Sequence, residues 1–163
     1  MKIGIIIIFH NNETQIDKDF LIEQINAFET IELCFVDNDS KDQTLNLLQE
    51  IRESCISHVS IVEVKKNTSE DAAKRAGARY MYNQFNLKHI GFVNVAELHK
   101  KGQQLSSIIK NLSLNKIEVI DLNSRIIEEQ DVKRTFFKSI FSLVDYLKNI
   151  KTNNTTNNLN PSI

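Results

Sequence analysis

Ile3-Gly4-Ile5-Ile6-Ile7-Ile8-Phe9 is an apolar run of strand length that stops abruptly at the polar group His10-Asn11-Asn12-Glu13. The run is continuously apolar rather than alternating, which is typical of a strand that is covered on both faces. Such a strand needs helices on either side to exclude water. The segment therefore predicts an α/β fold with a polar loop at the carboxyl end of its first strand.

The following part of the chain repeats this pattern, because apolar runs of strand length alternate with amphipathic stretches of helical length. Further strands are expected over residues 32–36, 59–64, 89–93 and 117–120, and helices over residues 20–28, 42–53, 70–83 and 103–112. Regular alternation of strands and helices predicts a mainly parallel sheet flanked by helices on both faces, a Rossmann-like three-layer sandwich.

The C-terminal part is expected to depart from this alternation. Residues 131–149 carry an apolar stripe and predict one last helix, which would pack on the sheet or on a second subunit. Residues 151–163 are rich in Asn and Thr and have almost no apolar side chains, so they predict a disordered tail. The expected organisation is one domain over residues 1–150 followed by that tail.

Charge and composition argue against several classes of protein. The 163 residues include 20 Lys and Arg against 21 Asp and Glu, a net charge of −1, whereas nucleic-acid-binding surfaces carry a clear basic excess. The two cysteines, Cys34 and Cys55, lie outside any Cys/His cluster and are expected to be buried free thiols of a cytoplasmic protein. No apolar run approaches the roughly 20 residues that cross a bilayer, so a peripheral contact with the inner face of a membrane is the most that is expected.

Polar side chains follow each expected strand. They occupy residues 10–13, 37–40, 67–69, 94–97 and 121–124. In open parallel sheets, ligands bind beyond the carboxyl ends of the strands, where such loops converge. The pattern predicts a site for a polar small molecule, although Asp, Asn and Ser also serve as turn and cap residues in loops of this kind.

The second polar group is the most informative. Leu33-Cys34-Phe35-Val36-Asp37-Asn38-Asp39-Ser40-Lys41-Asp42-Gln43-Thr44 resembles the strand and "VDDGSTDGT" loop of family-2 glycosyltransferases, GT-A-fold enzymes that use nucleotide-diphosphate sugars. Residues 5–13 are similar to the family's opening "IIIPTYNNE", and residues 66–77 to its "ENxGxxxARNxG" segment. Residues 89–93 take the place of the strand before the metal-binding DxD motif. With four segments in register, the chain is identified as a member of this family.

The resemblance implies a nucleotide site at the carboxyl edge of the sheet. The first loop would hold the base and the ribose through Phe9, His10, Asn11 and Glu13, and the second loop would do so through Asp37. A carboxylate suits this role because it accepts charge-assisted hydrogen bonds from a base N–H or a ribose hydroxyl.

Other residues in the matched segments have more than one interpretation. Asp39 stands where the family usually has Gly, and it would either contact the nucleotide or cap the following helix. Lys74 matches a family Arg that approaches the diphosphate, and a solvated helical face explains it equally well. Ser69 fits the N-cap of the third helix, whereas Ala73 and Gly77 fit close packing of that helix on the sheet.

The fourth segment departs from the family pattern. Asn94 and Ala96 replace the two aspartates of the DxD motif, and a methyl group offers no ligand to Mn²⁺ or Mg²⁺. The resemblance implies that Asn94 contacts the nucleotide and that Glu97 is a substitute carboxylate, as metal ligand and catalytic group. A helix N-terminal acid is the alternative interpretation of Glu97. The divalent cation used by the family is left without its usual ligands.

The expected catalytic base also departs from the pattern. Family members continue into an acceptor-binding region with an "ED" base motif, whereas this chain is nearly finished at that point. Glu128, Glu129 and Asp131 resemble the motif, and an acidic first turn of the next helix explains them at least as well.

Two functions are consistent with these observations. The first is a transferase that binds a UDP-, GDP- or dTDP-linked sugar and transfers the sugar with inversion to an acceptor hydroxyl. The second is an inactive GT-A-fold binding or regulatory module, in a homodimer or beside an active glycosyltransferase, joined through the helix over residues 131–149. An aspartate phosphohydrolase and an EF-hand are disfavoured, because Lys41, Asp42 and Leu48 stand where those motifs require other residues.

Overall fold

The computed structural model describes residues 1–56, 58–130 and 136–159 and contains a five-stranded sheet in the order β3-β2-β1-β4-β5, with every neighbouring pair parallel. The strands are β1 (Ile3–Phe9), β2 (Ile31–Asn38), β3 (Val59–Val64), β4 (His89–Asn94) and β5 (Phe141–Ser142). The first four lie where the sequence predicts them. The α/β class and the parallel sheet are therefore confirmed.

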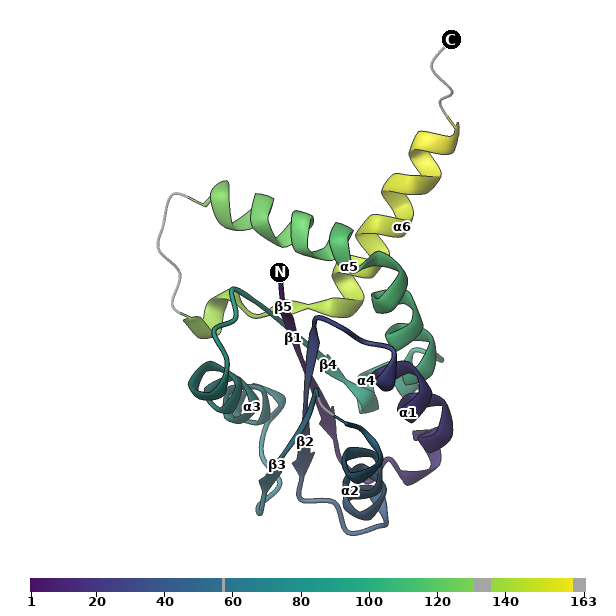
Figure 1. Cartoon of the computed structure of the whole chain (residues 1–163), viewed down its shortest axis with the longest axis vertical. Helices are drawn as coiled ribbons and strands as arrows, with labels where there is room; N and C mark the ends of the chain where they lie inside the picture. The colour runs from purple at the N-terminus through teal and green to yellow at the C-terminus, as the bar shows by residue number, and fades with distance from the viewer. Residues whose placement is uncertain (57, 131–135, 160–163) are drawn as a thin grey trace.

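Helices cover both faces of this sheet (Figure 1). They are α1 (Lys18–Asn26), α2 (Thr44–Ser54), α3 (Glu70–Gln84), α4 (Val95–Lys100), α5 (Leu105–Glu128) and α6 (Leu143–Leu159), with the 3₁₀ helices η1 (Glu13–Gln15) and η2 (Phe136–Ser139). Residues of α1, α2, α4, α5 and α6 share one core with the sheet, and residues of α3 and η2 share the other. This is the predicted three-layer arrangement.

The central strand β1 separates the two cores. Ile5 and Ile7 belong to the core under α1 and α5, whereas Ile6 and Ile8 belong to the core under α3. All seven residues of β1 are buried. A polar side chain on either face of this strand would lose its contact with water, which explains why the run is continuously apolar.

Helix α3 lies close to the sheet because Gly77 has no side chain. A Cβ at this position would lie 2.8 Å from Cγ2 of Ile6 and 2.9 Å from Cγ2 of Val36. Ala73, one turn earlier, is fully buried, and Ser69 caps the helix by accepting a hydrogen bond from the Ala72 amide at 3.2 Å. The predicted packing and capping roles are confirmed.

Residues 117–120 are helical, so the prediction of a fifth strand there is wrong. They lie within α5, which has non-helical dihedral angles at Asn115 (φ −122°, ψ 23°). Val119 and Ile120 are buried while Ile117 is 68% exposed, a spacing that fits one face of a helix. A short apolar run is compatible with either structure, and packing against the core decides. Residues 121–124 are therefore not a loop at the carboxyl edge.

The fifth strand is instead β5, inside the segment that the sequence predicts as one helix over residues 131–149. That segment contains η2, β5 and the beginning of α6, while residues 131–135 lie outside the described part. Phe141 pairs with Gly91 of β4, where a Cβ would lie 2.5 Å from Cε2 of Phe141. The ring of Phe141 thus occupies space that a side chain at position 91 would fill. This fit between distant residues overrides the local helical pattern, and α6 packs on the sheet as predicted.

Residues 151–159 continue α6, which differs from the expected disordered tail. Thr152, Thr155 and Thr156 each donate an Oγ1 hydrogen bond to the carbonyl four residues earlier, at 3.0 Å. Residues 151–158 are exposed, and this end of α6 projects beyond the domain (Figure 1). The helix extends from a packed first part that includes Leu147 and Ile150, which supplies the nucleus that an isolated polar segment lacks.

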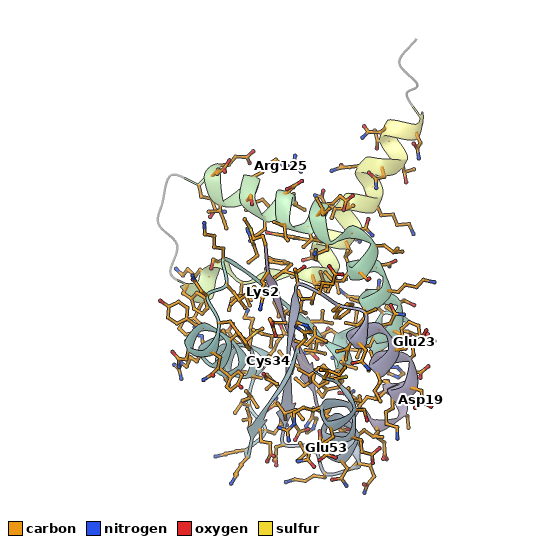
Figure 2. The ribbon with its side chains drawn as sticks, viewed as in Figure 1. Lys2, Asp19, Glu23, Cys34, Glu53 and Arg125 are labelled. Atoms are coloured by element: carbon orange, nitrogen blue, oxygen red, sulfur yellow. The ribbon has the colours of Figure 1, made fainter. Side chains whose placement is uncertain are left out.

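The interior holds the first cysteine and the surface holds most charges. Cys34 lies between the sheet and α3, and burial raises the pKa of its thiol to about 12 (Figure 2). Cys55 is a half-buried free thiol. Asp19 and Glu23 on α1 and Glu53 on α2 point outward (Figure 2).

Within the described residues, no helix combines the length and the hydrophobicity needed to span a bilayer.

A buried polar cluster joins the amino end of β4 to α5 and α6. Tyr146 donates its hydroxyl to Oδ1 of Asn123 at 2.9 Å, so the Asn123 amide nitrogen is the donor to Nδ1 of His89, 2.8 Å away. His89 is 3% exposed. Burial lowers the pKa of His89, and the positive charges of Lys88 and the N-terminus lower it further. The neutral imidazole is the form that accepts the bond from Asn123.

We expect Gly77→Ala to lower the free energy of unfolding by about 1 kcal/mol. Overpacking costs about 1–3 kcal/mol, and this exceeds the roughly 1 kcal/mol that Ala gains over Gly in a helix. Urea denaturation followed by circular dichroism measures the change. Asn83→Ala, at an exposed position of α3, is the control and should be neutral or stabilising. Equal stability of the two variants would contradict the close approach of α3.

We also expect the protein to lose stability below about pH 6.5, the ordinary pKa of histidine, because the folded state holds His89 with a lowered pKa. In that range the unfolded chain binds more protons than the folded one, so the free energy of unfolding falls as the pH falls. Urea titrations at several pH values should show a shallower decline for His89→Gln than for the wild type. His99→Gln, at an exposed position, should keep the wild-type decline; equal declines in all three proteins would exclude His89 as the cause.

Candidate functional site

The carboxyl ends of β1, β2 and β4 meet at one edge of the sheet. Phe9, the last residue of β1, is level with Asp37 of β2, and Ile8 is level with Asn94 of β4. Asp37 and Asn94 therefore flank the end of β1 on either side. The polar groups that follow these strands converge at this edge, as the sequence predicts.

Asp37 is a buried carboxylate with spare hydrogen-bonding capacity. The residue is 3% exposed, and its Oδ2 accepts a hydrogen bond from the Ser40 amide at 3.3 Å. Its Oδ1 is buried and has no hydrogen-bond partner within the described residues. A buried polar atom without a partner is uncommon in folded proteins and costs about 1–3 kcal/mol. The structure thus leaves one acceptor at the end of β2 for a donor from outside.

The first and second loops are fastened together by hydrogen bonds. Nδ1 of His10 donates to the carbonyl oxygen of Asn38 at 2.7 Å. The Asn11 amide donates to Oγ of Ser40 at 3.0 Å, and Oδ1 of Asn11 accepts from the Lys41 amide at 2.7 Å. The side chains of His10 and Asn11 therefore shape this edge, in addition to any contact with a ligand.

Glu13 also joins the first loop to the second, at residues 42 and 43. Its amide donates to Oδ2 of Asp42 at 3.2 Å, and its Oε2 accepts from the Gln43 amide at the same distance. Asn12, a residue that the sequence does not single out, is buried between these contacts. It donates its amide to Oγ1 of Thr44 at 2.8 Å and accepts the His10 amide at 2.6 Å. Because the neighbours of Asn12 in this loop are also polar, the sequence gives no sign that this one side chain is buried.

The second loop is also joined to the third. Nδ2 of Asn38 donates to the carbonyl oxygen of Thr68 at 2.8 Å, and Oδ1 of Asn38 accepts from the Thr68 amide at 3.0 Å. Asn38 is buried, and sequence reasoning does not assign it a role. Three loops are thereby held in one arrangement around Asp37.

Asp39 adopts a backbone conformation that explains its place in the loop. Its φ is 59°, the left-handed region that favours glycine and tolerates Asp and Asn. Its carboxylate pairs with Nζ of Lys41 at 2.7 Å and accepts from the Asn67 amide at 3.3 Å. The hydrogen bond from Lys41 lowers the pKa of Asp39. The interpretation of Asp39 as a helix cap is wrong, because Gln43 is the N-cap of α2.

Phe9 belongs to the core. Its ring is fully buried and meets Phe35 edge to face, with centroids 5.5 Å apart. Phe9, expected among the nucleoside-binding residues, therefore has its side chain in the core, and its backbone lies at the carboxyl end of β1.

Helix α4 begins directly at the end of β4, where the resemblance would place the DxD motif. Asn94 is its N-cap, since Oδ1 accepts the Ala96 amide at 3.1 Å, while its Nδ2 donates to Oε2 of Glu70 at 2.8 Å. Glu97 lies in the first turn of α4 and pairs with Lys100 at 3.0 Å. The interpretation of Glu97 as a helix N-terminal acid is therefore confirmed.

These residues do not fit the divalent cation of the family. Hard cations take several oxygen ligands, but the oxygen of Asn94 already accepts a hydrogen bond and Ala96 has none. Across residues 1–56, 58–130 and 136–159, no group of three or more His, Cys, Asp or Glu side chains is arranged to hold a metal ion. The donor set of a DxD site is not present at the end of β4.

Lys74 lies on α3 beside the same edge. Its Nζ is 4.5 Å from the centroid of the Phe92 ring and 3.2 Å from Oδ1 of Asp71, and its side chain is 17% exposed. Phe92 also lines the cavity that contains Asn94. The position of Lys74 over this ring is more specific than a solvated helical face.

Glu129 is not brought to this edge. It is the exposed C-cap of α5, six residues beyond Asn123, which contacts the first residue of β4. The second half of α5 crosses the amino ends of the strands (Figure 1). Glu129, expected as a catalytic residue, is thus not brought together with the other predicted site residues, and Asp131 lies outside the described residues.

Two cavities flank α4 at the carboxyl edge. One, of about 260 Å³, is lined by residues that include Asn94, Glu97, Glu70 and Asp145. The other, of about 460 Å³, lies on the α1 side of α4. Asp145 lies in the first turn of α6, which begins directly after β5. Because no strand is predicted there, the sequence gives no reason to select Asp145.

Comparison with solved structures finds crystal structures of TarS from S. aureus. The first has 19% identity and a TM-score of 0.44, covering 58% of this chain and 16% of TarS. TarS 1-349 in complex with UDP has 21% identity and a TM-score of 0.42, covering 58% and 27%. TarS 1-349 alone has 18% identity and a TM-score of 0.43, covering 68% and 32%. The chain thus spans less than a third of each of these structures.

Curated protein sequences give no match to this chain. A family comparison does give one, to the model described as Glycosyl transferase family 2, over residues 4–160. The match runs from the second residue of β1 through the other four strands and includes the polar edge described above, so the chain belongs to glycosyl transferase family 2.

Proposed function

We propose that the chain binds a nucleotide-diphosphate sugar at the carboxyl edge of the sheet, as the donor-binding domain of a glycosyltransferase. The carboxylate of Asp37 carries this proposal, because it is buried at the end of β2 with Oδ1 unpaired within the described residues. A base N–H or a ribose hydroxyl would satisfy that oxygen with a charge-assisted hydrogen bond. Membership of the family supports the same assignment.

The hydrogen-bonded loops prepare this edge for a ligand. The bonds that join Asn11 to Lys41 and Glu13 to Gln43 fix the backbone around Asp37 before any ligand arrives. Ordering these loops in advance reduces the entropy that binding would otherwise cost. His10 and Asn11 then add contacts to the nucleoside from the first loop.

Lys74 would meet the diphosphate. Its ammonium lies over Phe92, which lines the cavity that contains Asn94. An ammonium group attracts phosphate oxygens as a point charge, and this one is held by the ring and by Asp71. The nucleoside would lie at the end of β2, and the sugar would lie toward β4.

In the transfer itself, the acceptor hydroxyl oxygen would form a bond to the anomeric carbon while the bond from that carbon to the diphosphate oxygen breaks. Attack from the opposite face inverts the configuration, and a carboxylate takes the proton of the hydroxyl. Glu97 is the sequence-predicted carboxylate that lines the cavity with Asn94. The nucleoside diphosphate leaves with the electron pair of the broken bond.

A binding module without turnover is the second candidate function. The N-cap at the end of β4 favours it, because Asn94 and Ala96 lack the anionic oxygens that hold a divalent cation in the family. Without a cation the departing diphosphate loses electrostatic stabilisation. Such a module would act beside an active glycosyltransferase or a second copy of the chain, and its free thiols suit a cytoplasmic location.

We expect Asp37→Asn to weaken nucleotide binding by about 10- to 100-fold, because the charge-assisted hydrogen bond is worth about 1.5–3 kcal/mol. Calorimetric titration with UDP, GDP and dTDP measures the affinity of each. Asp121→Asn, at an exposed position of α5, makes the same chemical change away from the edge and should bind like the wild type. Unchanged affinity in Asp37→Asn would remove Asp37 from the site, and failure of the wild type to bind all three nucleotides would overturn the proposal.

We expect Ala96→Asp to raise the affinity for Mn²⁺ in the presence of UDP by about tenfold or more, because it restores an anionic oxygen ligand beside the proposed diphosphate. Calorimetry with Mn²⁺ measures this change. Ala27→Asp, exposed at the end of α1, adds the same charge elsewhere and should have no effect.

Release of UDP from a panel of UDP-sugars then distinguishes the two candidate functions. Release by the wild type supports the transferase, whereas release only after Ala96→Asp supports the module. If Mn²⁺ affinity is no higher in Ala96→Asp than in Ala27→Asp, the lost ligand at position 96 does not explain the departure from the family.

A further inference from the structure

The cavity of about 460 Å³ on the α1 side of α4 is not used by the proposed nucleotide site. Its size lies within the roughly 300–1,000 Å³ typical of small-molecule sites. The beginning of α1, helix α4 and the beginning of α5 form its walls, and its apolar lining includes Ile16, Val95 and Leu105. The cavity opens at the same edge of the sheet as Asp37 and Asn94.

Several polar side chains around this cavity have no hydrogen bond within the part of the chain that the structure describes. They are His99, Gln103, Gln104 and Ser106. On the opposite wall, Oδ1 of Asp17 accepts the Phe20 amide at 3.1 Å, which leaves Oδ2 available. Amide, hydroxyl, imidazole and carboxylate groups thus line one concave space, where His99, Gln103 and Gln104 are exposed and can exchange water for the hydroxyl groups of a ligand.

The chemistry of this lining selects one class of ligand. Among the described residues that line the cavity there is no Lys or Arg, so a phosphate or carboxylate would find no cation and would face Asp17. An apolar ligand would desolvate the amides without pairing them. A hydroxyl group both donates and accepts, as Gln and Ser do, and therefore pairs with each of them. The carbon-bound faces of a sugar ring would rest on the apolar lining.

The position of the cavity links it to the donor. Leu98 and Gln103 line both this cavity and the one that contains Asn94. The two spaces are thus neighbours on either side of α4. We propose that the larger cavity binds an uncharged saccharide, which acts as the acceptor; the acceptor role rests on the proposed function, whereas saccharide binding does not.

Titration of the full chain with maltotriose, cellotriose and N,N′,N″-triacetylchitotriose tests this proposal, with trigalacturonate as the anionic comparison. We expect at least one uncharged trisaccharide to bind and to shift the amide resonances of residues 14–17 and 98–106 in ¹H–¹⁵N spectra. Trigalacturonate should bind more weakly, because no cation lines the cavity. Absence of binding by all three uncharged probes, or tighter binding of trigalacturonate, would overturn the proposal.

The double variant Gln104→Ala/Ser106→Ala locates the site. Neither residue lines the cavity with Asn94, and Gln104 makes no side-chain cap to α5, so folding and UDP affinity should be retained. Loss of two hydrogen bonds should weaken saccharide binding by about tenfold. Gln84→Ala/Ser54→Ala, at exposed helix ends elsewhere, is the matched control.

Equal weakening in both double variants, or none in either, would place the saccharide outside this cavity and overturn the proposal. If the saccharide binds as expected while UDP, GDP and dTDP all fail to bind, the proposed nucleotide site fails and the saccharide site stands. If the nucleotides bind and the saccharides do not, the saccharide site fails and the proposed nucleotide site stands.

Discussion

The burial of β1 on both faces constrains the rest of the molecule. Because all seven of its residues are shielded from water, the strand has no room for a polar side chain, and helical layers must cover it on either side. Polar groups are therefore confined to the ends of the strands. At the carboxyl end this concentrates the hydrogen-bonding residues of three loops around Asp37, which is level with the last residue of β1.

Residues of the first two loops at that end are hydrogen-bonded to one another, whether or not a ligand is bound. Asn11 and Glu13 would be assigned from the family motif to a nucleoside, yet each accepts a hydrogen bond from the backbone of the second loop. These bonds give the amide of Asn11 and the carboxylate of Glu13 a structural role in this chain even before a ligand is considered. Asp37 Oδ1, which has no hydrogen-bond partner among the described residues, is thus held in a preformed loop pair, and a ligand that bound there would cost little reorganisation.

Local patterns predict the first four strands and the helices between them because each of those elements buries a periodic apolar face of its own. They fail where the decisive contact is distant in sequence. The ring of Phe141 fits over Gly91, and this contact creates β5 in a segment whose periodicity is helical. Similarly, the apolar side chains of residues 117–120 are compatible with a strand until packing shows Val119 and Ile120 on one face of α5.

The candidate site shows the same division. The place of Asp37 at the carboxyl edge is predictable, because the residue ends an apolar run of strand length in a parallel sheet. The buried Asn12 and Asn38 are not predictable, because a polar loop residue gives no sign of whether it faces water or other loops. Phe9 is a different case, because its position in the motif suggests a ligand contact and gives no sign that its ring meets Phe35 in the core.

The departure at the end of β4 is not required by the fold. Asp caps helices about as well as Asn, so an aspartate at position 94 could serve α4 equally well. What it could not do is donate to Glu70, which accepts from Nδ2 of Asn94 at 2.8 Å. Two carboxylates at that distance would repel each other unless a proton or a cation lay between them. The hydrogen bond between Asn94 and Glu70 needs no cation between the two side chains. Because α3 supplies one partner and β4 the other, the motif at residues 94–97 does not reveal this contact.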